Sequence, residues 1–337
     1  MQGPREYGSL SEVRSALGGR LSRADQPCLF DRFDWLESLY RHCLADKRVR
    51  IIEARDGEDA AWMFLLTSDG RRLSALANWY SFSWAPIFTG SPGAPTRARM
   101  LDALAAHMLR DTAQIDLYPM TDMDGMAALL LAAFRRAGWL AVRRPMGGNY
   151  RLNLKGRDFA AYWAERPGPL RTLVRRKSRD ALTIRVTDRM TPADWDAYVA
   201  IHARSWKAPE PHIDFFRELA QREGAAGTLR LGFATMGDQP VATQLWTVEN
   251  GVALIHKLAH DRAFDSASPG TLLSHAMFRH VIDGDRVDMI DYGTGDNGYK
   301  RDWMDARAPL HRIDCFNPRF ASSWLPAART AISALVG

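Results

Sequence analysis

The sequence predicts two tandem α/β domains, each built on a central mixed sheet flanked by helices. The length of 337 residues suits two domains better than one. With 46% hydrophobic and 25% charged residues, the chain has the composition of a globular protein that buries a substantial core. The order of the expected elements in the first half also recurs in the second half, although the two halves share no repeated sequence.

Hydrophobic spacing and turn residues place the elements of the first half. Residues 34–44 have helical spacing, the run Ser68-Asp69-Gly70 suits a hairpin turn, and Gly138 suits a helix end. The expected order is helix, three strands, helix, strand, helix and two strands, at residues 34–44, 48–54, 61–67, 72–78, 95–110, 113–118, 126–137, 139–144 and 149–154.

The second half is expected to repeat that arrangement. Thr191 followed by Pro192 is a typical helix start. Helices are expected at 159–166, 169–181, 191–204, 213–223, 271–282 and 297–304, and strands at 182–186, 229–236, 239–248, 252–260, 287–292 and 309–317. The predicted domains are 1–155 and 156–325, joined near 155–165, with a tail at 326–337.

Several classes of protein are disfavoured by the composition. The longest apolar stretches, such as 126–134, are far shorter than the ~20 residues of a membrane span, and the first residues lack the apolar core of a signal peptide. We therefore expect a cytoplasmic protein. Cys28, Cys43 and Cys315 form no CxxC pair, which predicts reduced thiols and neither a disulfide framework nor a metal site.

Positive charge is concentrated in one stretch. Residues 141–185 hold twelve Lys or Arg against three acids, a local excess of +9 in a chain whose net charge is +6. Such a stretch suits a phosphate-bearing ligand, an anionic membrane surface or RNA, or it is an ordinary solvated helix face.

The residues most suggestive of chemistry lie between 252 and 317. Ser268-Pro269-Gly270-Thr271 opens an expected helix, where Gly270 lets a ligand approach the backbone and free N–H groups suit a diphosphate. A well-capped structural helix explains the same tripeptide. The next strand ends in a glycine-rich turn, at the sheet edge where open α/β proteins hold ligands.

The run Lys257…Ser268-Pro269-Gly270…Asp291-Tyr292-Gly293-x-Gly295-Asp296-x-x-Tyr299-Lys300 resembles the GNAT-type acyltransferases of the CelD-like kind. These are similar to the FemAB-type aminoacyltransferases, and the chain more loosely resembles bacterial ceramide synthases. The resemblance covers about residues 160–318 and implies two GNAT-like domains, the first degenerate. It implies a donor on the edge of strand 252–260, with its diphosphate at Ser268–Thr271. The usual Q/R-x-x-G-x-G/A loop is absent, so acyl carrier protein or aminoacyl-tRNA remains an alternative donor to acyl-CoA.

Amide formation needs a base, an oxyanion donor and an acid for the leaving group. His260 and Asp291 are the candidate bases, Tyr299 the candidate acid, and Lys257 a further catalytic candidate. Each also has a structural interpretation: a surface histidine, a loop-capping aspartate, a core aromatic and an ion-paired lysine.

An acceptor site is predicted from aromatic residues of the first domain. Tyr80, Phe82 and Trp84 alternate and form either an apolar substrate groove or core packing. Asp296 and Lys300 are further substrate-binding candidates, and Trp163, Trp206, Trp246 and Trp303 are candidate walls.

Three functions remain open. The first is an N-acyltransferase that moves a long-chain acyl group from acyl-CoA, with no permanently bound cofactor, to an amine such as a sphingoid lipid, at the inner membrane surface. The second is a FemAB-like enzyme that uses aminoacyl-tRNA, ranked lower because no coiled-coil heptads are seen, so nucleic acid is the less favoured partner. The third is a non-catalytic protein, or an acyltransferase, of envelope polysaccharide synthesis.

Overall fold

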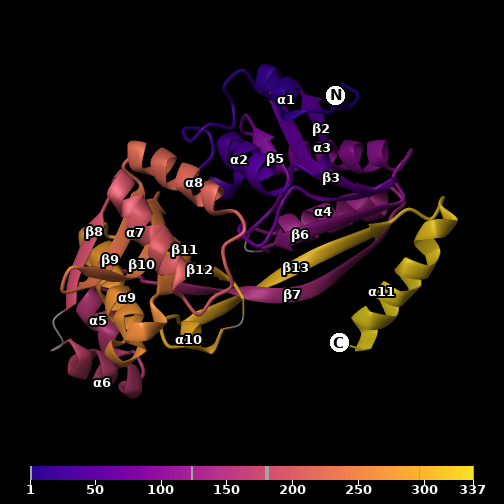
Figure 1. Cartoon of the computed structure of the whole chain (residues 1–337). Helices are drawn as coiled ribbons and strands as arrows, with labels where there is room; N and C mark the ends of the chain where they lie inside the picture. The colour runs from indigo at the N-terminus through magenta and orange to yellow at the C-terminus, as the bar shows by residue number, and fades with distance from the viewer. Residues whose placement is uncertain (1, 123, 179–181, 296, 337) are drawn as a thin grey trace. The chain divides into compact units, whose positions relative to one another are not determined.

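The computed structural model describes residues 2–122, 124–178, 182–295 and 297–336 (Figure 1). The chain forms two compact units, Met1–Gly147 with Pro309–Gly337 (unit 1) and Gly148–Ala308 (unit 2). Each unit has a mixed sheet with helices packed on it, so the predicted α/β class is confirmed. The division differs from the predicted domain boundaries, because the last strand pairs antiparallel with a strand of unit 1.

Unit 1 contains most of the elements expected in the first half. Its sheet has the order β1-β2-β3-β4-β6-β13-β7, and β5 pairs with β3. The strands are β1 (Arg5–Tyr7), β2 (Arg48–Asp56), β3 (Asp59–Asp69), β4 (Arg72–Ala75), β5 (Ile87–Thr89), β6 (Gln114–Met120) and the larger parts of β7 (Leu140–Asn153) and β13 (Ala306–Phe316). The helices are α1 (Leu10–Leu17), α2 (Phe33–Cys43), α3 (Ala94–Met108), α4 (Met126–Arg136) and α11 (Trp324–Val336).

The core of unit 1 is mainly aliphatic. Apolar residues of β2, β3, β4, β6 and β13 pack against α3 and α4, as the spacing of residues such as Met100, Leu104 and Leu130 requires. Trp84 belongs to the same cluster.

Unit 2 has a sheet of order β7-β12-β11-β10-β9-β8. Its strands are β8 (Leu182–Thr187), β9 (Leu229–Met236), β10 (Gln239–Glu249), β11 (Val252–His260) and β12 (Met289–Thr294), beside the end of β7. Its helices are α5 (Phe159–Ala164), α6 (Gly168–Lys177), α7 (Pro192–Ala203), α8 (Ile213–Ala225), α9 (Pro269–Arg279) and α10 (Gly298–Arg301), with a 3₁₀ turn η2 (Arg262–Ala267) before α9.

Helix α9 is the central packing element of unit 2 and contacts β8, β9, β10 and β11 (Figure 1). The close approach depends on Gly232 of β9, since a Cβ there would lie 2.6 Å from Met277 Sδ. An aromatic cluster completes the core, in which the Phe278 ring meets those of Tyr162, Trp246 and Trp303. Helix α9 is thereby packed closely against the sheet of unit 2.

Three local predictions differ from the structure. The strands expected at 139–144 and 149–154 are one continuous strand, β7. The glycine at position 148 lets this strand approach its neighbour closely, because a Cβ there would lie 2.7 Å from Ala308 O. Residues 78–84 form turns rather than the end of a strand. The C-terminal tail expected from 326 onward lies within the helix α11, whose apolar residues lack clear caps in the sequence.

Candidate functional site

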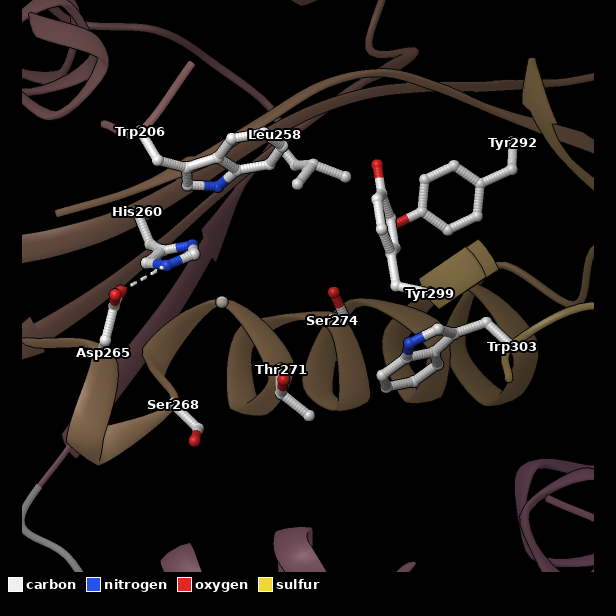
Figure 2. Close-up of a pocket in the computed structure, with 11 residues that line it drawn as sticks. Trp206, Leu258, His260, Asp265, Ser268, Thr271, Ser274, Tyr292, Tyr299 and Trp303 are labelled. Atoms are coloured by element: carbon white, nitrogen blue, oxygen red, sulfur yellow. Dashed lines mark hydrogen bonds and ion pairs between the residues drawn. The ribbon is translucent and has the colours of Figure 1, made fainter. Parts of the chain in front are cut away.

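A cavity of about 430 Å³ opens in unit 2 between the ends of β11 and β12 and helix α9 (Figure 2). Aromatic and polar side chains share its lining, as in most small-molecule sites. The lining residues are Trp206, Leu258, His260, Asp265, Ser268, Gly270, Thr271, Ser274, Tyr292, Tyr299 and Trp303.

The cavity exists because β11 and β12 separate. They pair in parallel only from Val252–Leu254 with Met289–Asp291, and their later described residues share no ladder. The exposed strand edges carry backbone carbonyls that need donors. Lysine ammonium groups supply them: Lys207 Nζ donates to Leu258 O at 2.7 Å, and Lys300 Nζ donates to Tyr292 O at 3.0 Å and Thr294 O at 2.6 Å.

Both lysines are partly desolvated. Burial, with the neighbouring Lys257 and Lys300 charges, lowers the pKa of Lys207 to about 8. Burial also lowers the pKa of Lys300 to about 8, against the attraction of Asp291. Lys300 therefore binds backbone carbonyl groups beside the cavity and is not one of its lining residues.

His260 and Asp265 form a dyad at one end of the cavity (Figure 2). His260 Nε2 lies 2.8 Å from Asp265 Oδ1, an arrangement that fixes the ring and places a proton on Nε2. Nδ1 then carries the lone pair that can accept a proton. A Cβ on Gly270 would lie 3.1 Å from this Nδ1, so the glycine makes room for the histidine as well as for a ligand.

The start of α9 offers fewer donors than the sequence suggested. Ser268 has left-handed backbone angles (φ 53°) and its side chain makes no cap hydrogen bond. Pro269 has no N–H, and the Thr271 and Leu272 N–H groups donate to Ser268 O at 3.1 Å. Among the described residues nothing accepts from Gly270 N–H, which leaves one donor next to His260.

Two predicted catalytic residues lie outside the cavity lining. Asp291 is 2% exposed and accepts from Arg151 Nε and from Gly293 N, both at 2.8 Å, while burial raises its pKa. Lys257 forms an ion pair with Glu210 and lies over the Phe216 ring. Asp291 is therefore bonded to the loop that follows it and Lys257 is ion-paired, as the structural interpretations of these two residues predict.

Tyr299 lines the cavity and packs edge-to-face on Tyr292, with ring centroids 5.9 Å apart. Sequence reasoning gave no role to Tyr292, Asp265, Ser274 or Lys207. The sequence marks two of these residues only weakly: Tyr292 lies within the motif that ends at Lys300, and Asp265 follows His260 by five residues.

The predicted acceptor residues Tyr80, Phe82 and Trp84 are buried in unit 1 and do not line the cavity. Trp84 N donates to Pro119 O at 2.6 Å and its indole N–H donates to Phe64 O at 3.2 Å. Asp296 lies outside the described residues.

Two other kinds of site are absent from the part of the chain that the structure describes. The described residues contain no cluster of His, Cys, Asp and Glu able to hold a metal ion. None of their helices has the length and apolar character to span a bilayer.

Residues 170–301 match the acetyltransferase (GNAT) domain family. No curated protein matches the chain. Over 97% of both chains, the fold is similar to the C-terminal domain assigned to a lysylphosphatidylglycerol synthetase of Agrobacterium fabrum (TM-score 0.59, 13% identity).

It is also similar to FemX over 94% of this chain and 98% of that one (TM-score 0.59, 10% identity). A tandem GNAT protein from the clavulanic acid biosynthesis pathway matches over 92% and 98% (TM-score 0.51, 14% identity). At these identities the likeness concerns the fold. The family match covers residues 170–301, and the likeness to a tandem GNAT protein extends over most of the chain.

Proposed function

We propose that the protein transfers an aminoacyl group from an aminoacyl-tRNA donor to an amine, as a FemAB-like enzyme. The observation that carries the proposal is the bond from Lys207 Nζ to Leu258 O. The family resemblance implies that the amide groups of a pantetheine arm bind to this edge of β11. Here the carbonyl oxygen of Leu258 already accepts a hydrogen bond from Lys207, which disfavours such an arm.

The start of α9 supports the same donor. A diphosphate is best bound by several free N–H groups at a helix start, but in the described residues only Gly270 N–H remains available. An ester of a tRNA 3′ end needs neither strand pairing nor a diphosphate cradle. The whole-length likeness to FemX and to a lysylphosphatidylglycerol synthetase domain supports an aminoacyl group further.

In the proposed reaction His260 Nδ1 takes a proton from the acceptor ammonium, and the amine attacks the ester carbonyl carbon. The C–N bond forms, the C–O bond to the ribose breaks, and the proton from His260 passes to the leaving ribose oxygen. His260 then takes the second proton that the new amide nitrogen loses and releases it to solvent. Holding both substrates in the cavity supplies much of the acceleration.

Acyl-CoA is the second candidate donor, because the matched family is an acetyltransferase family. The comparisons give no support to the ceramide-synthase-like form, and neither the sphingoid acceptor nor a membrane surface is part of the proposal.

Transfer to a panel of amines should be measured with labelled aminoacyl-tRNA and with acyl-CoAs of several lengths. We expect amide formation from aminoacyl-tRNA and no saturable binding of coenzyme A. Transfer from acyl-CoA, with none from aminoacyl-tRNA, would reverse the proposal.

The variant Lys207→Met tests whether the hydrogen bond from Lys207 to Leu258 O determines which donor binds. Removing the ammonium should expose Leu258 O and increase acyl-CoA binding, whereas Lys47→Met in unit 1 should not. If neither variant changes acyl-CoA binding, the lysine does not control the donor.

A further inference from the structure

Residues 204–210, the segment between α7 and α8, are attached to β11 and to the residue that follows it. An ion pair and a backbone bridge hold the start of the segment, a hydrogen bond holds its middle, and a second ion pair holds its end. The pairs are Arg204 and Ser205 with Asp261, Lys207 with Leu258 O, and Glu210 with Lys257. Trp206 lies between the first two attachments, so its backbone is kept beside the end of β11.

The side chain of Trp206 is not part of the core. It is 53% exposed, yet it lines the cavity, and Figure 2 shows the indole on the opposite side of the cavity from α9. No aromatic ring of the described residues stacks on it, and its neighbour is the ammonium group of Lys207, 5.6 Å from the ring centroid. The face of the indole is therefore available to a flat ligand.

The ammonium group beside this ring forms no ion pair with a described carboxylate. Glu210, which is close to Lys207 in the chain, pairs with Lys257 instead. Lys207 Nζ gives one of its three protons to Leu258 O, and no other described residue accepts from it. An open aromatic face next to an unpaired cation is the combination that binds single-stranded nucleic acid, with a base on the ring and a phosphate at the cation.

The position of the indole along β11 connects it with the proposed general base. Leu258 and His260 line the same cavity, and two residues of a strand span about 7 Å. A nucleotide whose base rests on the indole can therefore bring its ribose to His260. An alkyl chain would cover the ring equally well, but it would leave the ammonium group of Lys207 without a partner.

We propose that Trp206 is the stacking platform for the last, unpaired base of the RNA donor. The proposal rests on the proposed function and names the residue that holds the end of that donor. The base stacks on the indole, the phosphate before it lies at Lys207, and the ester on the terminal ribose faces His260. Because stacking holds a base by its face, the platform positions the ester without recognising the amino acid that it carries.

The platform is tested with an RNA hairpin that carries no amino acid and therefore cannot react. The hairpin ends in the unpaired bases of a tRNA 3′ end, and its last base is 2-aminopurine, whose fluorescence falls when it stacks. The wild-type protein should quench this fluorescence on binding, and Trp206→Leu should remove most of the quenching. Trp79→Leu, at a residue of unit 1 that is 62% exposed, should quench as the wild type does. Equal quenching by Trp206→Leu and the wild type would overturn the inference.

Binding affinities test the same contact without the fluorescent base. Removing the last base of the hairpin should weaken binding to the wild type about tenfold, because one stacked base is lost. Trp206→Leu should bind the hairpins with and without that base equally, and Trp206→Tyr, which keeps a flat ring, should restore most of the difference. A tenfold difference that persists in Trp206→Leu would place the base elsewhere and contradict the inference.

Coenzyme A also carries an adenine, so it serves as the competitor that distinguishes the two sources of a base. We expect coenzyme A to leave the quenching of the hairpin unchanged. If it restores the fluorescence, the platform holds the adenine of a thioester donor and the RNA assignment is wrong. If the wild type binds no hairpin at all, the proposed donor fails and this inference fails with it, whereas a hairpin that binds independently of Trp206 refutes this inference alone.

Discussion

The two units separate parallel strands in the same way but use the gap differently. In unit 1, β4 and β6 pair only from Arg72–Ser74 with Gln114–Asp116, as β11 and β12 do over three pairs in unit 2. Trp84 from residues 78–84 then bonds to Pro119 O of β6 and packs into the core. In unit 2 the corresponding gap opens on a cavity lined by His260 and Tyr292.

This difference is the reason for placing the proposed chemistry in unit 2. The gap beside β6 is filled by a segment of its own chain, whereas the gap beside β12 is bridged only at its carbonyls by Lys207 and Lys300. In both units a gap forms where the two parallel strands separate. The gap of unit 1 is filled by residues 78–84, and that of unit 2 remains open as a cavity.

The sharpest contrast is between His260→Ala and Trp84→Phe. His260→Ala should lower kcat/KM about 10²–10⁴-fold with an unchanged melting temperature, because it removes the proposed base and leaves the core intact. Trp84→Phe should lower the free energy of unfolding by roughly 1–3 kcal/mol, because packing and the indole hydrogen bond are removed, and leave kcat of the folded enzyme unchanged. Steady-state kinetics and denaturant unfolding measure the two. The comparison fails if Trp84→Phe is as inactive as His260→Ala while it remains folded.

Acid should weaken the two units unequally. In unit 2, His202, His256 and His275 each have a pKa of about 4, with burial the main cause. A histidine whose pKa is lowered by folding stabilises the fold above its unfolded pKa near 6.5, and this stability is lost as the pH falls toward 4. Each contributes roughly 1 kcal/mol after solvent screening.

Unit 1 should respond less, because its pKa shifts oppose one another: folding lowers the pKa of Glu6, Asp56 and His311 but raises that of Asp31. Burial raises the pKa of Asp31 to about 6, with the nearby Asp124 adding to the shift. A carboxyl whose pKa is raised by folding favours the fold at low pH and loses that contribution as the pH rises through 6. Hydrogen exchange at pH 7 and pH 4.5, corrected for intrinsic rates, should show protection falling in unit 2 while unit 1 changes little. Equal losses in both units would contradict the assignment.

Much of the fold was accessible from the sequence, and less of the site. Periodicity and turn residues place most strands and helices, because these depend on neighbours along the chain. The pairing of β13 with β6 is non-local, so the position of residues 309–317 in unit 1 could not be predicted. Alternation put Tyr80, Phe82 and Trp84 on one face, but it cannot distinguish a groove from a segment that fills one.

The site shows the same limit. The tripeptide at 268–270 marked the right helix, and the histidine before it marked the right strand end. Lys207 comes from a loop with no motif, and its role is visible only through its bond to Leu258 O. Gly270 was assigned to a ligand, whereas its nearest neighbour is the ring of His260.

Gly270→Ala tests that proximity directly. Its Cβ would lie 3.1 Å from His260 Nδ1, so the ring has to move by a few tenths of an ångström. We expect kcat to fall about tenfold with a small change in melting temperature, since a base out of line is less effective. Gly168→Ala at the start of α6, where nothing lies within 4 Å, is the matched control. A shift of the His260 ring signals by NMR should accompany the lower rate, and unchanged signals with a lower rate would point to ligand contact instead.

The smallest expected effect concerns the charged surfaces. Arg14, Arg99 and Arg136 of unit 1 are each ion-paired, with Glu37, Asp56 and Asp102. Arg171, Arg175 and Arg176 of α6 are exposed, and no described side chain pairs with them. Unpaired arginines on one helix are available to the phosphates of a tRNA, whereas paired ones are not.

Changing the three α6 arginines to Gln should therefore weaken tRNA binding by a fewfold at low salt. The slope of log affinity against log salt should fall by about 0.7–0.9 for each phosphate group that the variant no longer binds. The same triple change at Arg14, Arg99 and Arg136 alters the net charge equally and should leave the slope unchanged, which separates local binding from overall charge. If both triples shift the slope equally, α6 is only a solvated face. If the α6 triple instead abolishes binding to anionic vesicles and spares tRNA, the basic stretch serves a membrane, and the donor has to be sought again among acyl thioesters.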